Sequence, residues 1–257
     1  MNRTLLAAGL CLVASVPAAA QERPEGPRGE AVGRGTLRGY ANPSAVIAAE
    51  LALDRDAAAR GQWTALAATA APAAVVFTPA PGTRIAWARD WLKGRANPPG
   101  AERWQSRSVW SSCDGALVVS RGIWRAGDRG GWFARVWQRQ GDGSYKWLVT
   151  RSGAEVRDDA EPDMIAAQVA ECPARKARDE DEPHRKSRPP KPARAKDLPP
   201  LDPLRHGGAS PDGSLRWEAS VGGDGGPHLT AVWRKDGAEQ ALPVDGMAGS
   251  SPPPNLR

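Results

Sequence analysis

The stretch from Arg103 to Gly153, RWQSRSVWSSCDGALVVSRGIWRAGDRGGWFARVWQRQGDGSYKWLVTRSG, decides the fold that the sequence predicts. It contains four runs rich in β-branched and aromatic residues, separated by glycine turns at residues 114–115, 127–131 and 141–143. Short glycine turns between such runs are a strong local signal for antiparallel hairpins. The stretch therefore predicts a four-stranded antiparallel meander, and six of the eleven tryptophans lie within it.

The residues before this stretch predict helices and one strand. Asn42 followed by Pro43 is typical of a helix start and Gly61 of a helix end, so we expect a helix between them. Further predicted elements are a short helix at residues 63–69, a strand at 75–78 and a helix at 85–95.

The first predicted helix carries acids on its apolar side. Ile47, Leu51, Asp54 and Ala58 fall on one stripe at helical spacing, with Glu50 beside them. A carboxyl group pushed into an apolar pocket has a raised pKa and can act as a general acid or base near neutral pH. Asp54 and Glu50 are therefore the candidate catalytic residues. The alternative is that Asp54 forms an ion pair with Arg55, with Arg84 or with an arginine of the sheet.

Residues 1–20 have the pattern of a secretory signal peptide. A basic start is followed by an apolar core and by the small residues Ala18, Ala19 and Ala20. We therefore expect an exported protein, periplasmic or secreted, with residues 21–40 as a disordered lead-in. No later run approaches the ~20 apolar residues of a membrane-spanning helix, so no membrane span is expected.

Most of the net positive charge lies in one proline-rich segment. The net charge is +6, and residues 173–197 contain nine Lys or Arg against five Asp or Glu. A solvated, proline-rich linker over residues 173–205 explains this charge better than a nucleic-acid surface does, so no nucleic-acid partner is expected. Residues 206–246 predict a small three-stranded antiparallel appendage, and residues 247–257 a disordered tail.

A family resemblance rests on the runs ELALDRDAAARGQWTAL, AAVVFTP and GWFARVWQRQGDGSYKWLVTRSG. These runs resemble nuclear transport factor 2-like domains (SnoaL-like or ketosteroid-isomerase-like), from an uncharacterised secreted branch. The resemblance covers residues 41–153, within an expected domain at 41–160. It implies an α+β fold in which helices pack on a curved antiparallel sheet, a cystatin-like α+β roll that forms a cone around a pocket. Members are often dimers, which implies a homodimer through the sheet.

The resemblance includes both enzymes and binding modules. Isomerase-like members place an aspartate near the end of the strand that corresponds to AAVVFTP, where this chain has Thr78. The histidines and tyrosines lie outside the expected pocket or at the start of a strand. The resemblance therefore implies a fold more strongly than an activity.

The tryptophans have two interpretations. Trp87, Trp110, Trp124 and Trp137 are the candidates to line a pocket for a small apolar ligand. Alternatively, the tryptophans bury a large area in the core and in a dimer interface.

The mature chain contains two cysteines, Cys113 and Cys172. A disulfide between them would close a loop of about 60 residues and stabilise the fold by roughly 4 kcal/mol, and two free thiols are the alternative. No Cys or His pair has metal-ligand spacing, so the sequence predicts no metal. The glycine run at residues 222–226 is a turn and not a phosphate-binding loop, and no cofactor is expected.

Three functional hypotheses follow from these patterns. The leading one is a non-catalytic module that binds a small molecule or a protein. The second is an isomerase, hydratase or cyclase that uses Asp54 or Glu50. The third is a cell-envelope interaction protein that acts through its basic linker and tail.

Overall fold

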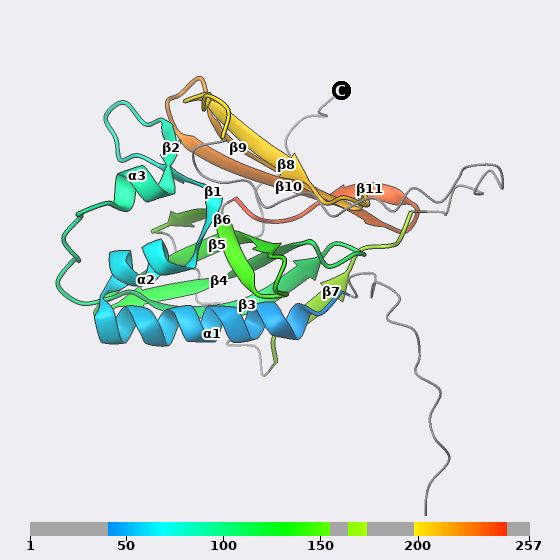
Figure 1. Ribbon diagram of the computed structural model, residues 1–257, viewed down its shortest axis with the longest axis horizontal. Coiled ribbons are helices and arrows are strands. Elements are labelled where there is room, and N and C mark those ends of the chain that lie inside the picture. Colours follow the sequence, from blue (N-terminus) through cyan, green and yellow to red (C-terminus); the bar gives the residue numbers. More distant parts are fainter. Residues whose placement is uncertain (1–40, 155–163, 174–197, 246–257) are drawn as a thin grey trace, which may run out of the picture. The chain divides into compact units, whose positions relative to one another are not determined.

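The meander from Arg103 to Gly153 forms the centre of the larger of two sheets in the computed structural model (Figure 1). The structure describes residues 41–154, 164–173 and 198–245. The meander consists of β3 (Arg103–Ser111), β4 (Leu117–Ala126), β5 (Arg129–Arg139) and β6 (Tyr145–Gly153). These strands pair antiparallel in chain order, so the predicted meander is confirmed.

Three further strands extend the meander into a mixed seven-stranded sheet of order β2-β1-β6-β5-β4-β3-β7. β1 (Ala70–Phe77) lies parallel to β6, and β2 (Ile85–Trp87) lies antiparallel to β1. At the other edge, β7 (Ala166–Val169) lies parallel to β3. β7 is only four residues long and was not predicted from the sequence.

Two of the predicted helices are confirmed. α1 (Pro43–Arg60) begins after Asn42, whose side chain accepts a hydrogen bond from the amide of Ala45 (3.3 Å), and it ends at Gly61. α1 packs against β3 and α2 (Gln62–Thr69) packs against α1 (Figure 1).

Asn97 fixes the corner between these two helices. Its Oδ1 accepts hydrogen bonds from the amides of Trp63 (2.8 Å) and Thr64 (3.2 Å), which are free donors at the start of α2. Its Nδ2 donates to the carbonyl of Arg60 at the end of α1 (3.3 Å). A single side chain from a distant loop therefore satisfies both helix ends.

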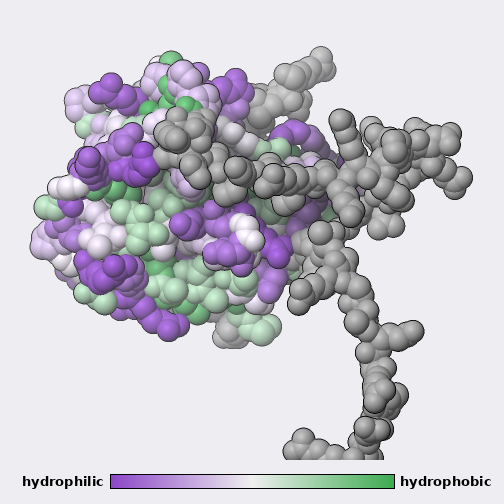
Figure 2. All heavy atoms as spheres, in the orientation of Figure 1, coloured by the Kyte–Doolittle hydropathy of each residue, from purple (hydrophilic) through white to green (hydrophobic). Residues whose placement is uncertain are grey.

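The buried face of α1 differs from the predicted stripe. The buried residues are Val46, Glu50, Leu53, Asp54 and Ala57. Leu51, which the prediction placed inside, is 47% exposed, and Ala58 is also exposed. Alanine occurs all around this helix, so apolar spacing does not identify its buried face, and in Figure 2 the region of α1 shows both pale green and purple residues.

The helix predicted at residues 85–95 is wrong in its first turn. Ile85–Trp87 forms β2, and only α3 (Ala88–Leu92) is helical. The amide of Ile85 donates to the carbonyl of Pro203 (2.7 Å), and β2 pairs with β1. These long-range hydrogen bonds stabilise an extended backbone that helical spacing alone does not predict.

The smaller sheet is an antiparallel meander of four strands, not three. Its strands, in chain order, are β8 (Arg205–Ala209), β9 (Leu215–Val221), β10 (Pro227–Lys235) and β11 (Ala238–Ala241). The missed strand β8 has the sequence RHGGA, whose glycines obscure a strand signal. At Gly207 a Cβ atom would lie 2.6 Å from the carbonyl oxygen of Trp217, so glycine permits the close approach of β8 and β9.

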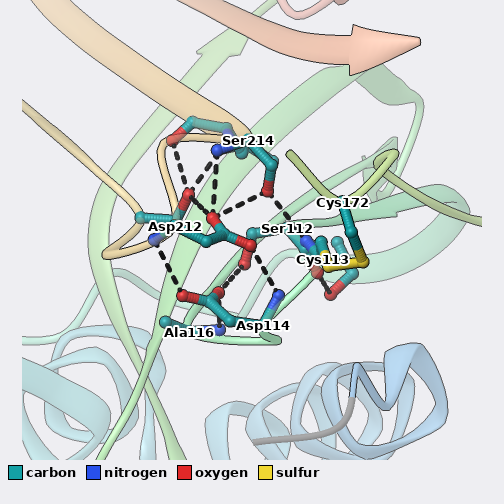
Figure 3. Close-up of a disulfide and its surroundings, with 10 residues drawn as sticks. Ser112, Cys113, Asp114, Ala116, Cys172, Asp212 and Ser214 are labelled. Carbon is teal, nitrogen blue, oxygen red and sulfur yellow. Dashed lines mark hydrogen bonds between the residues drawn. A yellow bond between two sulfur atoms is a disulfide. The ribbon is translucent and has the colours of Figure 1, made fainter. Parts of the chain in front are cut away.

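Each meander has a first turn of the form Ser-x-Asp-Gly-x-Leu, at residues 112–117 and 210–215 (Figure 3). In each turn the serine hydroxyl donates to Oδ1 of the aspartate (2.7 and 2.6 Å). In each, the leucine amide donates to the serine Oγ (3.1 Å in both). Gly115 and Gly213 both have φ of +70°, a backbone conformation that favours glycine. The two turns are therefore a structural repeat.

The repeated turns bind each other. The amide of Asp114 donates to Oδ2 of Asp212 (2.8 Å), and the amide of Asp212 donates to Oδ2 of Asp114 (3.2 Å). The amide of Cys113 donates to Oγ of Ser214 (2.8 Å). The two sheets are thus joined by a nearly reciprocal set of hydrogen bonds, which Figure 3 shows.

Residues 164–173 connect the same two sheets. After β7, Cys172 forms a disulfide with Cys113, with the two Cα atoms 5.1 Å apart. The Glu171 carboxylate accepts hydrogen bonds from the amides of Asp236 and Gly237 (2.8 Å each), in the turn between β10 and β11. The pairing that the sequence left open is therefore present, and it lies where this segment crosses from one sheet to the other.

The predicted fold class is wrong. Instead of an α+β roll of helices on a curved antiparallel sheet, the described residues are mostly β, in one mixed sheet and one antiparallel sheet. Only 18% of these residues are helical, in three helices. The difference arises because β7, β2 and the parallel contact of β1 with β6 enlarge the first sheet, while the predicted appendage is a complete second sheet.

Several predicted segments lie outside the described residues. They are the signal peptide at 1–20, the lead-in at 21–40, most of the linker at 173–205 and the tail at 247–257. The described end of that linker contacts the fold, since Pro203 and Leu204 accept hydrogen bonds from the amides of Ile85 and Val221. Among the described residues, no helix has the length and apolar character needed to cross a membrane.

Candidate functional site

A cavity of about 420 Å³ lies where α2, α3, the end of β1 and strands β5 and β6 meet. Most of its lining side chains are apolar, and several are aromatic. The lining residues are Gln62, Trp63, Leu66, Val76, Phe77, Thr78, Pro79, Ala80, Thr83, Trp91, Glu102, Trp104, Phe133, Arg135, Thr150, Arg151, Ser152 and Pro227.

Two tryptophans from the short helices form one aromatic wall. Trp63 lies at the start of α2, where Asn97 binds its amide, and Trp91 lies in α3. Their rings meet edge to face, with centroids 5.4 Å apart. The guanidinium of Arg95 stacks on Trp91, with Cζ 3.6 Å from the ring centroid. The wall is thus assembled from residues that are distant from the meander in sequence.

The lining also contains Arg135, a buried cation on β5. Its side chain is 1% exposed, and its Nη1 donates to Oε2 of Glu50 on α1. The Oε1 atom of Glu50 also accepts hydrogen bonds from the hydroxyl of Ser120 and from Nε1 of Trp137 (2.9 Å). A buried ion pair requires such additional hydrogen bonds to offset the desolvation of its charges.

For Arg135, the effect of burial on the pKa outweighs the effect of the neighbouring acids. Burial lowers the pKa of its guanidinium, while Glu50 and Glu102 act in the opposite direction. Its Nε is buried and has no hydrogen-bond partner among the described residues. Buried polar groups are normally paired, so an unpaired donor is unusual in a residue that lines the cavity.

Polar groups also mark the edge of the cavity near β3. Oε2 of Glu102 accepts a hydrogen bond from Nε1 of Trp104 (3.2 Å). Oε1 of Gln62 accepts one from the amide of Glu102 (3.3 Å). These bonds hold Trp104 and α2 together at the cavity.

Arg151 lines the cavity and connects it to the second sheet. Its Nε donates to the carbonyl of Pro227, the first residue of β10 (3.1 Å), and lies 3.6 Å from a carboxylate oxygen of Asp245. Burial lowers the pKa of Arg151, and Asp245 opposes that shift. The cavity is therefore completed by a contact between the two sheets.

Glu50, one of the two candidate catalytic acids, is occupied by structural partners. It is buried, and both of its oxygens accept hydrogen bonds from Arg135, Ser120 or Trp137. It is not among the residues that line the cavity, whereas Arg135 is. Its geometry is that of a counter-ion which orients Arg135.

Asp54, the other candidate, pairs with an arginine of the sheet, as the alternative interpretation held. Its carboxylate accepts hydrogen bonds from Nε (3.0 Å) and Nη2 (2.6 Å) of Arg103, and from the amide of Trp104 (2.8 Å). It borders a smaller hollow of about 180 Å³ that Arg103 also lines. Asp54 thus holds the start of β3 against α1.

The four tryptophans predicted to contact a ligand do not line the larger cavity. Trp137 binds Glu50 in the core, and Trp124 donates from Nε1 to the carbonyl of Gly153 (3.1 Å). Trp110 is buried in β3, and the ring of Trp87 lies 5.5 Å from that of His206.

Trp63, Trp91 and Trp104 line the cavity instead. Sequence reasoning missed them as a group because they belong to three elements that meet only in the folded chain. The sequence placed Trp63 and Trp91 in two separate predicted helices, at residues 63–69 and 85–95, and gave no signal that the two rings would meet.

The chemistry of this cavity has to be inferred from its own side chains. Within residues 41–154, 164–173 and 198–245, no three His, Cys, Asp or Glu side chains are grouped so that they could hold a metal ion. Comparison with protein-family models and with curated proteins finds no match for this chain.

Proposed function

We propose that this protein is a non-catalytic binding module that holds a small, mostly apolar molecule in the cavity between α2, α3 and the meander. The observation that carries the proposal is the cavity of about 420 Å³ lined by Trp63, Trp91, Trp104 and Phe133. Ligand pockets in proteins typically have volumes of ~300–1,000 Å³ and combine apolar or aromatic walls with a few polar groups.

The state of the two acids supports binding rather than catalysis. A general acid or base has to reach the reacting atom, directly or through one water. Glu50 and Asp54 are instead engaged by arginines, and Glu50 lies outside the cavity lining. The acid that does line the cavity, Glu102, accepts a hydrogen bond from Trp104.

The disulfide supports the proposal that the protein acts after export. Disulfides persist in the periplasm and outside the cell and are rare in the cytosol. The bond between Cys113 and Cys172 joins the turn of one sheet to the segment that binds the other. The predicted signal peptide is consistent with the same compartment, and a homodimer through the sheet stays a prediction.

The test is to reduce the cavity and measure the binding of a neutral apolar probe. Thr150 lines the cavity, and Thr230 is a threonine of similar exposure on β10 of the second sheet. We expect N-phenyl-1-naphthylamine to bind the wild type saturably, as followed by its fluorescence. Thr150→Phe should weaken this binding at least about tenfold, because the new ring occupies the cavity.

The matched control is Thr230→Phe, which should leave probe affinity within about twofold. Circular dichroism of each variant verifies that it is folded. A wild-type protein that does not bind the probe saturably would exclude the proposed function. Equal affinities for Thr150→Phe and Thr230→Phe would place the binding outside this cavity.

A further inference from the structure

Arg135 lines the cavity, although its side chain is almost completely buried. Its Nη1 donates to Glu50 on the α1 side, while its Nε is buried without a partner among the described residues. Because a buried donor without an acceptor is unfavourable, a ligand oxygen that reached Nε would gain binding free energy. Arg135 therefore favours a ligand that carries a hydrogen-bond acceptor.

The aromatic rings of the cavity already have cations beside them. Cζ of Arg135 lies 5.0 Å from the ring centroid of Phe133 and 5.2 Å from that of Trp104. Cζ of Arg95 lies 3.6 Å from the ring centroid of Trp91. A cationic ligand would have to compete with these guanidinium groups for the ring faces. The cavity therefore disfavours a cation.

The charged residues around the cavity do not give it a strong positive charge that would attract an anion by itself. Arg135 and Arg151 line the cavity together with one acid, Glu102, which gives a formal balance of +1. Outside the lining, Glu50 pairs with Arg135 and Asp245 lies 3.6 Å from Nε of Arg151, so each of the two cations has a counter-ion. A ligand anion would consequently be held by the N–H donors of an oriented guanidinium rather than by net charge.

We propose that the ligand of this cavity is an apolar carboxylic acid, whose carboxylate accepts a hydrogen bond from Nε of Arg135. This inference rests on the proposed binding function. The planar guanidinium matches a carboxylate in shape and forms stronger hydrogen bonds with it than with a neutral carbonyl. The body of the ligand lies against Trp63, Trp91 and Phe133, which belong to the apolar part of the lining.

A matched pair of probes tests the carboxylate. 2-Naphthoate and 2-naphthamide have the same rings and a similar planar head group, but only the first is charged. We expect isothermal titration calorimetry of the full chain to show 2-naphthoate binding at least about tenfold more tightly than 2-naphthamide.

Two double variants test whether Arg135 causes the preference for 2-naphthoate over 2-naphthamide. Glu50→Gln with Arg135→Met removes both charges of the buried pair and should abolish the preference while 2-naphthamide still binds. Asp54→Asn with Arg103→Met removes the other ion pair between α1 and the sheet and should retain the preference. A preference that survives the first double variant would overturn the assignment to Arg135.

The outcomes separate this inference from the binding function. Equal affinities for the two probes would overturn the carboxylate and leave the binding function intact, whereas failure of both probes to bind would remove both. Tighter binding of 2-naphthyl phosphate than of 2-naphthoate would indicate a phosphate site instead. If the first double variant does not fold, the 15N resonance of Arg135 Nε in the wild type decides: 2-naphthoate should shift it, and no shift would overturn the proposal.

Discussion

The two meanders of this protein share their local construction but differ in what they bury. Each begins with a Ser-x-Asp-Gly-x-Leu turn, and each has a Val-Trp pair on its third strand, at 136–137 and 232–233, followed by an Asp-Gly turn. In the first meander, α1 covers the sheet and Arg135 is buried with Glu50. In the second meander, the ion pair of Arg216 and Glu239 is exposed.

This difference shows that turn and strand patterns specify a meander without specifying its role. The cavity forms beside the first meander because α2 and α3 add aromatic side chains there. The second meander contributes Pro227 to the edge of that cavity through its contact with Arg151. The elements packed on a sheet therefore decide which of two similar sheets carries a site.

The largest expected effect on stability comes from removing the buried negative charge of Glu50, the counter-ion of Arg135 in the first meander. Glu50→Gln should lower the free energy of unfolding by about 3–5 kcal/mol, because it leaves the guanidinium of Arg135 buried without its counter-ion. Adding Arg135→Met should recover most of that loss, since the uncompensated charge is then removed. Urea denaturation measures both values.

The control for this prediction lies in the second meander. Glu239→Gln breaks the exposed pair with Arg216 and should change the free energy of unfolding by only about 0.2–1 kcal/mol. Similar losses for Glu50→Gln and Glu239→Gln would contradict the difference drawn between the two meanders.

The second prediction concerns the covalent connection between the sheets. Replacing Cys113 and Cys172 by serine should lower the free energy of unfolding by roughly 2–4 kcal/mol, because the unfolded chain gains the freedom of a loop that the bond had closed. Urea denaturation of the variant and of the oxidised wild type gives the difference. A variant as stable as the wild type would show that residues 164–173 are held without the disulfide.

The third prediction concerns the reciprocal turns. Asp114→Ala and Asp212→Ala should each cost about 1–3 kcal/mol, since each carboxylate accepts hydrogen bonds within its own turn and from the other turn. In a double-mutant cycle the two losses should add to more than the loss of the double variant, because the residues share hydrogen bonds.

Asp142 provides the matched comparison for these turns. It accepts hydrogen bonds from the amide and hydroxyl of Ser144, within a hairpin turn of the first meander. Asp142→Ala should therefore cost less than Asp114→Ala or Asp212→Ala. Strict additivity between Asp114 and Asp212 would mean that the two turns do not stabilise each other.

The smallest expected effect is a pH dependence at the contact between β8 and β2. The ring of His206 lies 5.5 Å from that of Trp87 and 5.7 Å from that of Trp217. Burial lowers the pKa of His206, and a backbone hydrogen bond with Ala73 opposes the shift. Below an unfolded-state pKa of about 6.5, the unfolded chain binds a proton that the folded protein does not.

Acidification should therefore destabilise the fold through His206, beginning near pH ~6.5 and continuing until the folded-state pKa is reached. The stabilising contribution is complete above that window. Urea denaturation at pH 7.5 and at pH 5.5 measures the loss, and His206→Gln should reduce it. An identical loss in His206→Gln and in the wild type would assign the pH dependence to other groups.

Local sequence determined the elements whose signals are short in range. The glycine turns defined the meander of residues 103–153, and Asn42 and Gly61 defined the ends of α1, because turns and caps depend on backbone conformation within a few residues. The family resemblance stays a prediction, but the fold class that it implied was wrong.

Tertiary structure alone decided the features that depend on distant partners. The buried face of α1 is set by the partners of Glu50 and Asp54, which lie on strands more than 45 residues away in sequence. Ile85–Trp87 became a strand because β1 and Pro203 bind its backbone. The cavity has the same origin: it is closed by side chains from helices, loops and both sheets, and their meeting depends on long-range packing that no local pattern encodes.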